Sequence, residues 1–170
     1  MSELQKVTVT VKNYESTSSD EHARLYKKVR MLDGAGKIIY YKNLIIPKYL
    51  ERHGAFARDI PRTWYVKKLH RSAVVLVAFE TPSGAVEYDL DEIRNVSRGG
   101  FWSGVLIGIA AIPAGVIVAI ATYGLGLALI PFMLYQAYSQ VFRIPARLSR
   151  KQLLQDFSQH GINVVEGWSR

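Results

Sequence analysis

The side chains best suited to metal or nucleophilic chemistry are thinly spread in this chain. Its four histidines do not show the spacing of a metal site, and they stand at His22, His53, His70 and His160. There is no cysteine, so disulfide bonds and thiolate chemistry are excluded. The Gly-x-Ser-x-Gly turn of serine hydrolases is also missing. We therefore expect no catalytic residue, no metal and no cofactor.

Carboxylates gather in the sequence Glu-Tyr-Asp-Leu-Asp-Glu at residues 87–92. On a strand, Glu87, Asp89 and Asp91 would share one face, because successive side chains point to opposite sides. Such a face is suited to a cation or to a basic partner. A solvated strand face is the simpler interpretation.

Basic residues stand next to aromatic ones in two segments, Tyr-Lys-Lys at 26–28 and Tyr-Val-Lys-Lys at 65–68. A nucleic-acid surface needs this combination. On a domain tethered to a cytoplasmic leaflet, attraction to anionic lipid explains it more simply, and we do not expect nucleic acid as a partner. The residues predicted to form a partner surface are Lys27, Lys28, Lys67, Lys68, Glu87, Asp89 and Asp91.

The longest feature of the sequence is one apolar run. Residues 101–142 contain no Asp, Glu, Lys, Arg or His, so every residue behind the net charge of +8 lies outside them. As a helix this run would extend over roughly 63 Å, about twice a hydrocarbon core of ~30 Å. We therefore predict a transmembrane hairpin of two helices over residues 99–142. A re-entrant or single-span arrangement and a buried hairpin of a soluble protein are the alternatives.

The flanks and the middle of the run predict its orientation. A turn is expected near 122–126, where glycine gives the backbone freedom to reverse, and it comprises Thr122, Tyr123, Gly124 and Gly126. Aromatic and basic residues at both ends are typical of membrane-surface anchors, namely Trp102, Arg94, Arg98, Arg143, Arg147, Arg150 and Lys151. By the positive-inside rule, we expect a multi-pass protein of the inner (cytoplasmic) membrane with both termini in the cytoplasm.

Small residues recur at helical spacing within the run. The two rows are Gly100, Gly104 and Gly108, and Ala111, Gly115 and Ala119. Such rows let membrane helices approach closely. We predict a helix interface here, either between the two arms or with another copy or a partner.

Residues 1–98 show the patterns of a small β-rich cytoplasmic domain. Apolar and polar residues alternate in several short segments, and turn-forming sequences separate them, as in Asp-Gly-Ala-Gly-Lys at 33–37 and Thr-Pro-Ser-Gly at 81–84. About six strands are expected, in a barrel or sandwich-like arrangement. The tail, residues 143–170, is predicted as a helix followed by a strand that packs on this domain. The fold class is thus an α+β membrane protein.

These expectations lead to a hypothesis of function. The chain is interpreted as a non-enzymatic integral membrane protein whose β-domain and hairpin bind a protein partner, as a membrane-complex subunit, an accessory protein or an immunity-type protein. The expected partners are a bilayer with an anionic leaflet and another membrane protein or a second copy. An oligomeric pore or channel component is the first alternative, and a membrane-tethered enzyme is the second.

Overall fold

A computed structural model describes residues 4–70, 72–123, 125–162 and 164. The chain divides into two compact units, one of Met1–Val96 with Arg150–Arg170 and one of Ser97–Ser149. In chain order the elements are β1 (Leu4–Asn13), β2 (Ser16–Ser19), β3 (Ala23–Asp33), β4 (Ile38–Pro47), α1 (Lys48–Arg52), β5 (Pro61–His70), β6 (Ala73–Glu80), β7 (Val86–Tyr88), α2 (Leu90–Ala121), η1 (Leu125–Ala128), α3 (Leu129–Tyr138), the π-helical η2 (Ser139–Arg143), α4 (Ile144–Arg147) and α5 (Arg150–Gln159).

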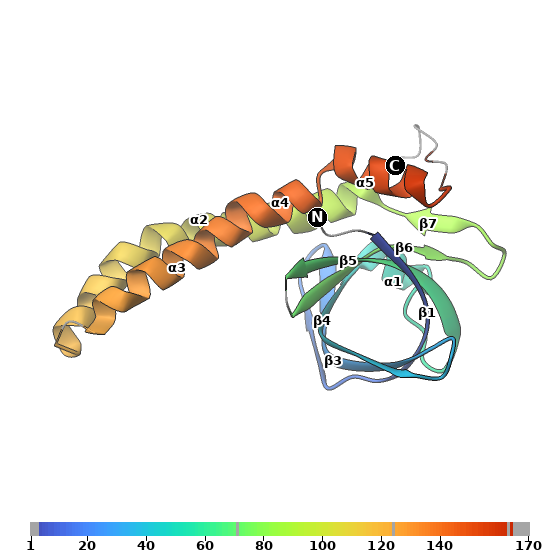
Figure 1. Cartoon of the computed structure of the whole chain (residues 1–170), viewed down its shortest axis with the longest axis horizontal. Helices are drawn as coiled ribbons and strands as arrows, with labels where there is room; N and C mark the ends of the chain where they lie inside the picture. The colour runs from blue at the N-terminus through green and yellow to red at the C-terminus, as the bar shows by residue number, and fades with distance from the viewer. Residues whose placement is uncertain (1–3, 71, 124, 163, 165–170) are drawn as a thin grey trace. The chain divides into compact units, whose positions relative to one another are not determined.

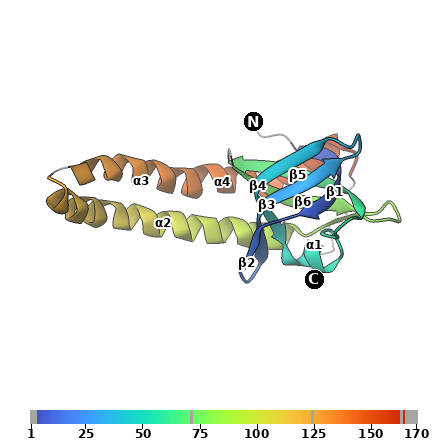
Figure 2. The same cartoon turned by 90° about the horizontal axis from the view of Figure 1, so that it is seen from below.

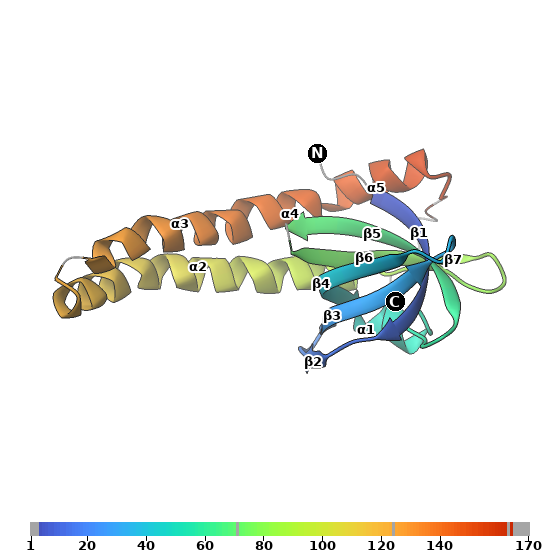
Figure 3. The same ribbon diagram turned by 60° about the horizontal axis from the view of Figure 1, so that its bottom comes forward.

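Five strands of the first unit pair in a ring, and Figure 1 shows the resulting barrel. They follow the order β1-β5-β6-β4-β3, and β3 pairs back with β1 to complete the ring. All of these pairings are antiparallel except β4 with β6, which run parallel side by side (Figure 3). Two short strands are added outside the ring, β2 on β3 and β7 on β6. With α1 between β4 and β5, this connectivity is that of the OB-fold, a five-stranded Greek-key barrel.

The alternating sequence of the strands fills the barrel interior with apolar side chains. Tyr26, Val29 and Met31 of β3 belong to the core, as do Leu44 and Ile46 of β4. Between Tyr26 and Val29 the strict alternation is interrupted. Lys28 adopts a positive φ of 51°, and both it and Lys27 are exposed. This local irregularity keeps the apolar side chains of both halves of β3 inside.

The helix α1 and the segment after it add core residues to the barrel. Leu50 and Ala55 are buried in the core, and the indole Nε1 of Trp64 donates a hydrogen bond of 2.8 Å to the Ala55 carbonyl oxygen. The hydroxyl of Tyr26 donates to Glu51 Oε1 at 2.5 Å. The pKa of Tyr26 is raised to about 12, mainly because the hydroxyl is buried and secondly because it donates to the Glu51 carboxylate.

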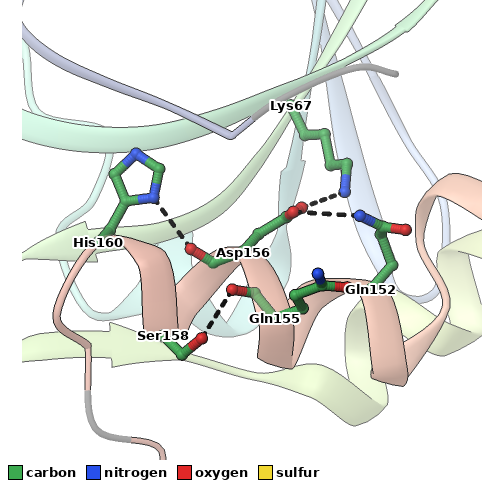
Figure 4. A network of polar contacts seen from close by, with 6 residues as sticks. All are labelled: Lys67, Gln152, Gln155, Asp156, Ser158 and His160. Atoms are coloured by element: carbon green, nitrogen blue, oxygen red, sulfur yellow. Dashed lines mark hydrogen bonds and ion pairs between the residues drawn. The ribbon is translucent and has the colours of Figure 1, made fainter.

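The helix α5 covers the outer side of β5. Leu153, Asp156 and Phe157 are its buried residues, and their spacing places them on one helix face. Figure 4 shows Asp156 between two donors, the ammonium group of Lys67 on β5 and the amide of Gln152, which donates to Asp156 Oδ1 at 3.2 Å. The Lys67 and Asp156 side chains are 1% and 8% exposed, so this is a buried ion pair.

In the second unit, α2 and the return segment η1–α4 lie antiparallel, as Figure 2 shows for α2 and α3. Within the described ranges, α2 alone is long and apolar enough to cross a membrane, with a mean hydropathy of 2.5 over its best 18-residue window. The return segment is divided into a 3₁₀ turn, a ten-residue α-helix, a π-helical turn and a four-residue helix. Ten α-helical residues extend over only about 15 Å.

The predicted fold class is therefore wrong in its central element, the transmembrane hairpin of two helices. The structure has a closed five-stranded barrel with added strands and helices, and its described residues include one helix long and apolar enough to span a membrane. The prediction failed because it assumed a second helix long enough to span the bilayer, whereas α3 is a regular α-helix only over Leu129–Tyr138 and a π-helical turn follows at Ser139–Arg143. The multi-pass arrangement loses its support with it. The strand predicted near residue 162 falls partly on residues 163 and 165, which lie outside the described residues.

Replacing Lys67 by Met is expected to destabilise the protein by about 3–5 kcal/mol, because it leaves the Asp156 carboxylate buried without its counter-charge. The double variant Lys67→Met/Asp156→Leu removes both charges and should recover most of this loss. Urea unfolding of the detergent-solubilised protein, followed by circular dichroism, measures both effects. A double variant as unstable as Lys67→Met would contradict a pairwise charge effect.

Candidate interaction surfaces

The outer surface of the second unit is apolar over most of its length. In α2, Ile109 and Ile117 are 70% and 68% exposed, and only 17% of the apolar window is buried. The core helix of a soluble protein would be mostly buried. Other large apolar side chains are also exposed here, among them Leu106, Ile112, Ile120, Phe132 and Phe142. This surface is suited to a hydrocarbon environment or to another apolar surface.

The predicted rows of small residues pack α2 on the return segment. A Cβ atom added to Gly104 would lie 2.8 Å from Gln140 Cβ, and one added to Gly115 would lie 2.3 Å from Ile130 Cγ1. Ala111 is fully buried, Gly108 and Ala119 are half-buried, and Gly100 lies in the same helix. Gly104 and Gly115 therefore contact the return segment of the same chain. Of the two interfaces considered from the sequence, the structure shows the one between the arms.

The chain reverses direction after Thr122. The Thr122 hydroxyl donates to the Val118 carbonyl at 2.6 Å and accepts a hydrogen bond from the Gly126 backbone N–H at 3.1 Å. Tyr123 has a positive φ of 52° and is fully exposed. Gly126 is pressed against α2, since a Cβ atom there would lie 2.1 Å from the Ala119 nitrogen. Three of the four predicted turn residues thus lie at the reversal, and the fourth, Gly124, is outside the described residues.

Gly126→Ala is expected to separate the two arms near the turn, because the new methyl group meets backbone atoms that have no free rotation. Gly108→Ala is the matched control, since its Cβ would lie at an ordinary 3.5 Å from Ala137 Cβ. Spin labels at Ala110→Cys and Leu134→Cys report the distance between the arms, and no other residue is labelled because the chain has no native cysteine. We expect a broader and longer distance distribution for Gly126→Ala only. Identical distributions for the two variants would refute the tight contact.

Aromatic and basic side chains gather at the end of the second unit away from the turn. Trp102 is exposed and forms an edge-on ring contact of 5.9 Å with Phe101. The Arg143 guanidinium lies 5.7 Å and 5.9 Å from the ring centres of Tyr135 and Tyr138. Amphipathic rings beside arginine are typical of a membrane–water interface. Of the other predicted anchors, Arg94, Arg98, Arg150 and Lys151 are exposed and Arg147 is half-buried.

Two carboxylates of the acidic sequence at 87–92 accept hydrogen bonds from backbone N–H groups of the same chain. Asp89 Oδ1 accepts backbone hydrogen bonds from Asp91 at 2.9 Å and Glu92 at 2.8 Å, as an N-cap residue of α2 does. Glu92, which the sequence analysis did not single out, accepts a 2.7 Å hydrogen bond from the Tyr49 backbone N–H, and burial raises the pKa of its carboxyl. Glu87 is half-buried, and only Asp91 is well exposed. The three predicted carboxylates do not form one free face.

The four predicted lysines divide between interior and surface. Lys67 is buried by α5 and cannot contribute to an exposed partner surface. Lys27, Lys28 and Lys68 are exposed. The sequence analysis did not single out Ile38, Tyr40 and Lys42, which are exposed on β4, the strand paired with β3. The alternation of residues 38–46 was the signal that would have revealed them.

An open depression of about 390 Å³ lies on the barrel where β5 begins and β6 ends. Ile60, Pro61, Arg62 and Glu80 are among its lining residues. The Nε atom of Arg62 is buried and has no hydrogen-bond partner within the described part of the chain. Glu80 forms an ion pair of 3.2 Å with Lys6. Exposed Ile60 could contact an apolar side chain of a partner protein, and Arg62 Nε could donate a hydrogen bond to an acceptor on the same partner segment.

The described ranges contain no group of three or more His, Asp or Glu side chains placed to hold a metal ion. Comparison with known proteins found no matching family model, no matching curated protein and no matching solved structure.

Proposed function

We propose that this protein is a non-enzymatic membrane protein that holds a small β-barrel at a bilayer surface, where the barrel binds a protein partner. The observation that carries the proposal is the outer surface of α2. Its isoleucine and leucine side chains are exposed while the small residues are used for packing on the return segment. An apolar helix surface of this kind is stable in hydrocarbon and unfavourable in water.

The side of the membrane follows from the charges and from the chain path. Arg94 and Arg98 precede the apolar run, and Arg143 and Arg147 follow it. By the positive-inside rule these ends face the cytoplasm. Met1–Val96 and Arg150–Arg170 form one compact unit, so the segments on both sides of residues 97–149 lie on the same side of the bilayer. We therefore place the barrel at the cytoplasmic face of an inner membrane.

A binding role is favoured over catalysis because Lys67, Asp156 and Glu51, which are buried or half-buried in the barrel unit, are engaged in structure. Lys67 pairs with Asp156 to hold α5. Glu51 accepts hydrogen bonds from Tyr26 and Arg24, both at 2.5 Å. Asp89 caps α2. An active site requires groups of this kind to be open to a substrate.

A pore is less well supported than an anchor. A water-filled path needs polar or charged groups along the helices. The Gln and Ser residues of the return segment are Gln136, Ser139 and Gln140, and Gln140 packs against Gly104 at the contact between the arms. The two arginines of this segment, Arg143 and Arg147, lie beyond the apolar run. Residues 101–142 carry no charge.

Ile109→Arg/Ile117→Arg is expected to remove the protein from membranes, because each arginine in the middle of a membrane helix costs about 2.5–3.5 kcal/mol on the insertion scale. Both positions are among the most exposed of α2. Thr17→Arg/Ile60→Arg adds the same charges at exposed positions of the barrel unit and should leave the protein in the membrane. Alkaline carbonate extraction followed by immunoblotting separates the two results. Retention of the α2 variant in the pellet would refute the anchor.

A photo-crosslinking amino acid at Ile60 tests for the partner. If the depression around Arg62 is the partner site, native membranes should yield one discrete adduct, and Arg62→Glu should reduce it at least about fivefold, since it reverses a buried donor. The same probe at Thr17, an exposed position of β2, is the control for non-specific capture. Adducts of equal yield at both positions, or none at Ile60, would contradict partner binding at this site.

A further inference from the structure

The outer face of the β3–β4 hairpin gathers cations around two exposed apolar side chains. The strand register places Arg30 opposite Tyr40 and Leu32 opposite Ile38. Ile38 is 69% exposed and Tyr40 is 52% exposed, although both are strand residues. The exposed cations of the same two strands are Lys27, Lys28, Arg30 and Lys42. We call these four cations, with Ile38 and Tyr40, the basic face.

Most of the charge of the basic face is not neutralised by the protein itself. Lys28 forms an ion pair of 2.5 Å with Glu15. Lys27, Arg30 and Lys42 have no ion pair with any carboxylate that the structure describes. The carboxylate of Asp33 in the adjoining turn accepts backbone hydrogen bonds from Ala35 at 2.9 Å and Lys37 at 2.8 Å. The carboxylate of Asp33 is therefore used to shape the hairpin turn.

The backbone contributes to this arrangement at Lys28. Its positive φ allows two successive residues of β3, Lys27 and Lys28, to be exposed between the buried Tyr26 and Val29. A non-glycine residue in this region is uncommon and carries a local cost. The irregularity concentrates positive charge beside Tyr40 and Lys42.

We propose that the basic face binds the anionic phospholipid headgroups of the leaflet into which α2 inserts. The proposal rests on the membrane anchoring proposed above. Lysine and arginine are attracted to an anionic leaflet, while a tyrosine ring and an isoleucine side chain settle in the headgroup region. Single-stranded nucleic acid needs several stacking rings, and this face exposes one. The bilayer is the anionic surface that an anchored barrel meets at high local concentration.

The test uses the full chain in lipid nanodiscs of phosphatidylcholine alone or with about 30% phosphatidylglycerol. An environment-sensitive fluorophore at Ala35→Cys reports on the hairpin turn without replacing any residue of the basic face. Ser18→Cys on β2 is the control, and the absence of native cysteine makes both labels specific. We expect the Ala35 label to brighten roughly twofold or more with a blue shift in the anionic discs only, and about 0.5 M salt should reverse it.

Arg30→Glu/Lys42→Glu should abolish this change while circular dichroism shows the fold intact. A signal independent of lipid charge, or one that survives the charge reversal, would overturn the proposal. A response to added poly-glutamate but not to anionic discs would assign the basic face to an acidic protein and overturn it as well. Failure of the chain to co-elute with either disc would refute the anchoring itself, so the two proposals fail in distinguishable ways.

Discussion

Closure of the five-stranded barrel is the constraint on which the rest of the first unit depends. A strand with an open edge leaves backbone N–H and C=O groups unpaired, and the pairings β1–β3 and β4–β6 remove the edges that a simple meander would leave. Once the ring is closed, its interior is filled by the side chains of the core, among which the Tyr26 hydroxyl and the Trp64 indole N–H find acceptors in α1 and the segment after it. The contacts of Lys67 and Glu92 with other elements form outside this core.

Most strands and turns of the barrel could be predicted from local sequence patterns, but the closure of the barrel could not. Alternation over 24–32 and 38–46 and the turn at Asp33 predict the β3–β4 hairpin that is found. The parallel pairing of β4 with β6 joins segments far apart in sequence, and no local pattern specifies it. The Ser-rich segment after β1 has the composition of a loop, yet Ser16–Ser19 pairs with β3 as β2. Hydropathy located the apolar run but could not show the π-helical turn that divides its second half.

The candidate surfaces show the same limit at the level of single residues. Lys27 and Lys67 stand in similar aromatic and basic sequences, but Lys27 is exposed and Lys67 is buried. The difference lies in Asp156, 89 residues further along the chain. The glycine rows were recognisable from their spacing, and Gly104, Gly108 and Gly115 lie at the contact between α2 and the return segment. Tyr40 and Arg30 become neighbours only through the register of the hairpin.

The long separation between Lys67 and Asp156 has a consequence for how the protein is made. During synthesis the barrel strands leave the ribosome first, then the apolar segment, and α5 last. Until α5 emerges, the outer side of β5 has neither the carboxylate that balances Lys67 nor the side chain of Phe157. The apolar segment therefore leaves the ribosome before the outer layer of the barrel can be completed. A chain that stops between these two points carries Lys67 without its counter-charge, and the side chain of Phe157 does not yet cover the barrel.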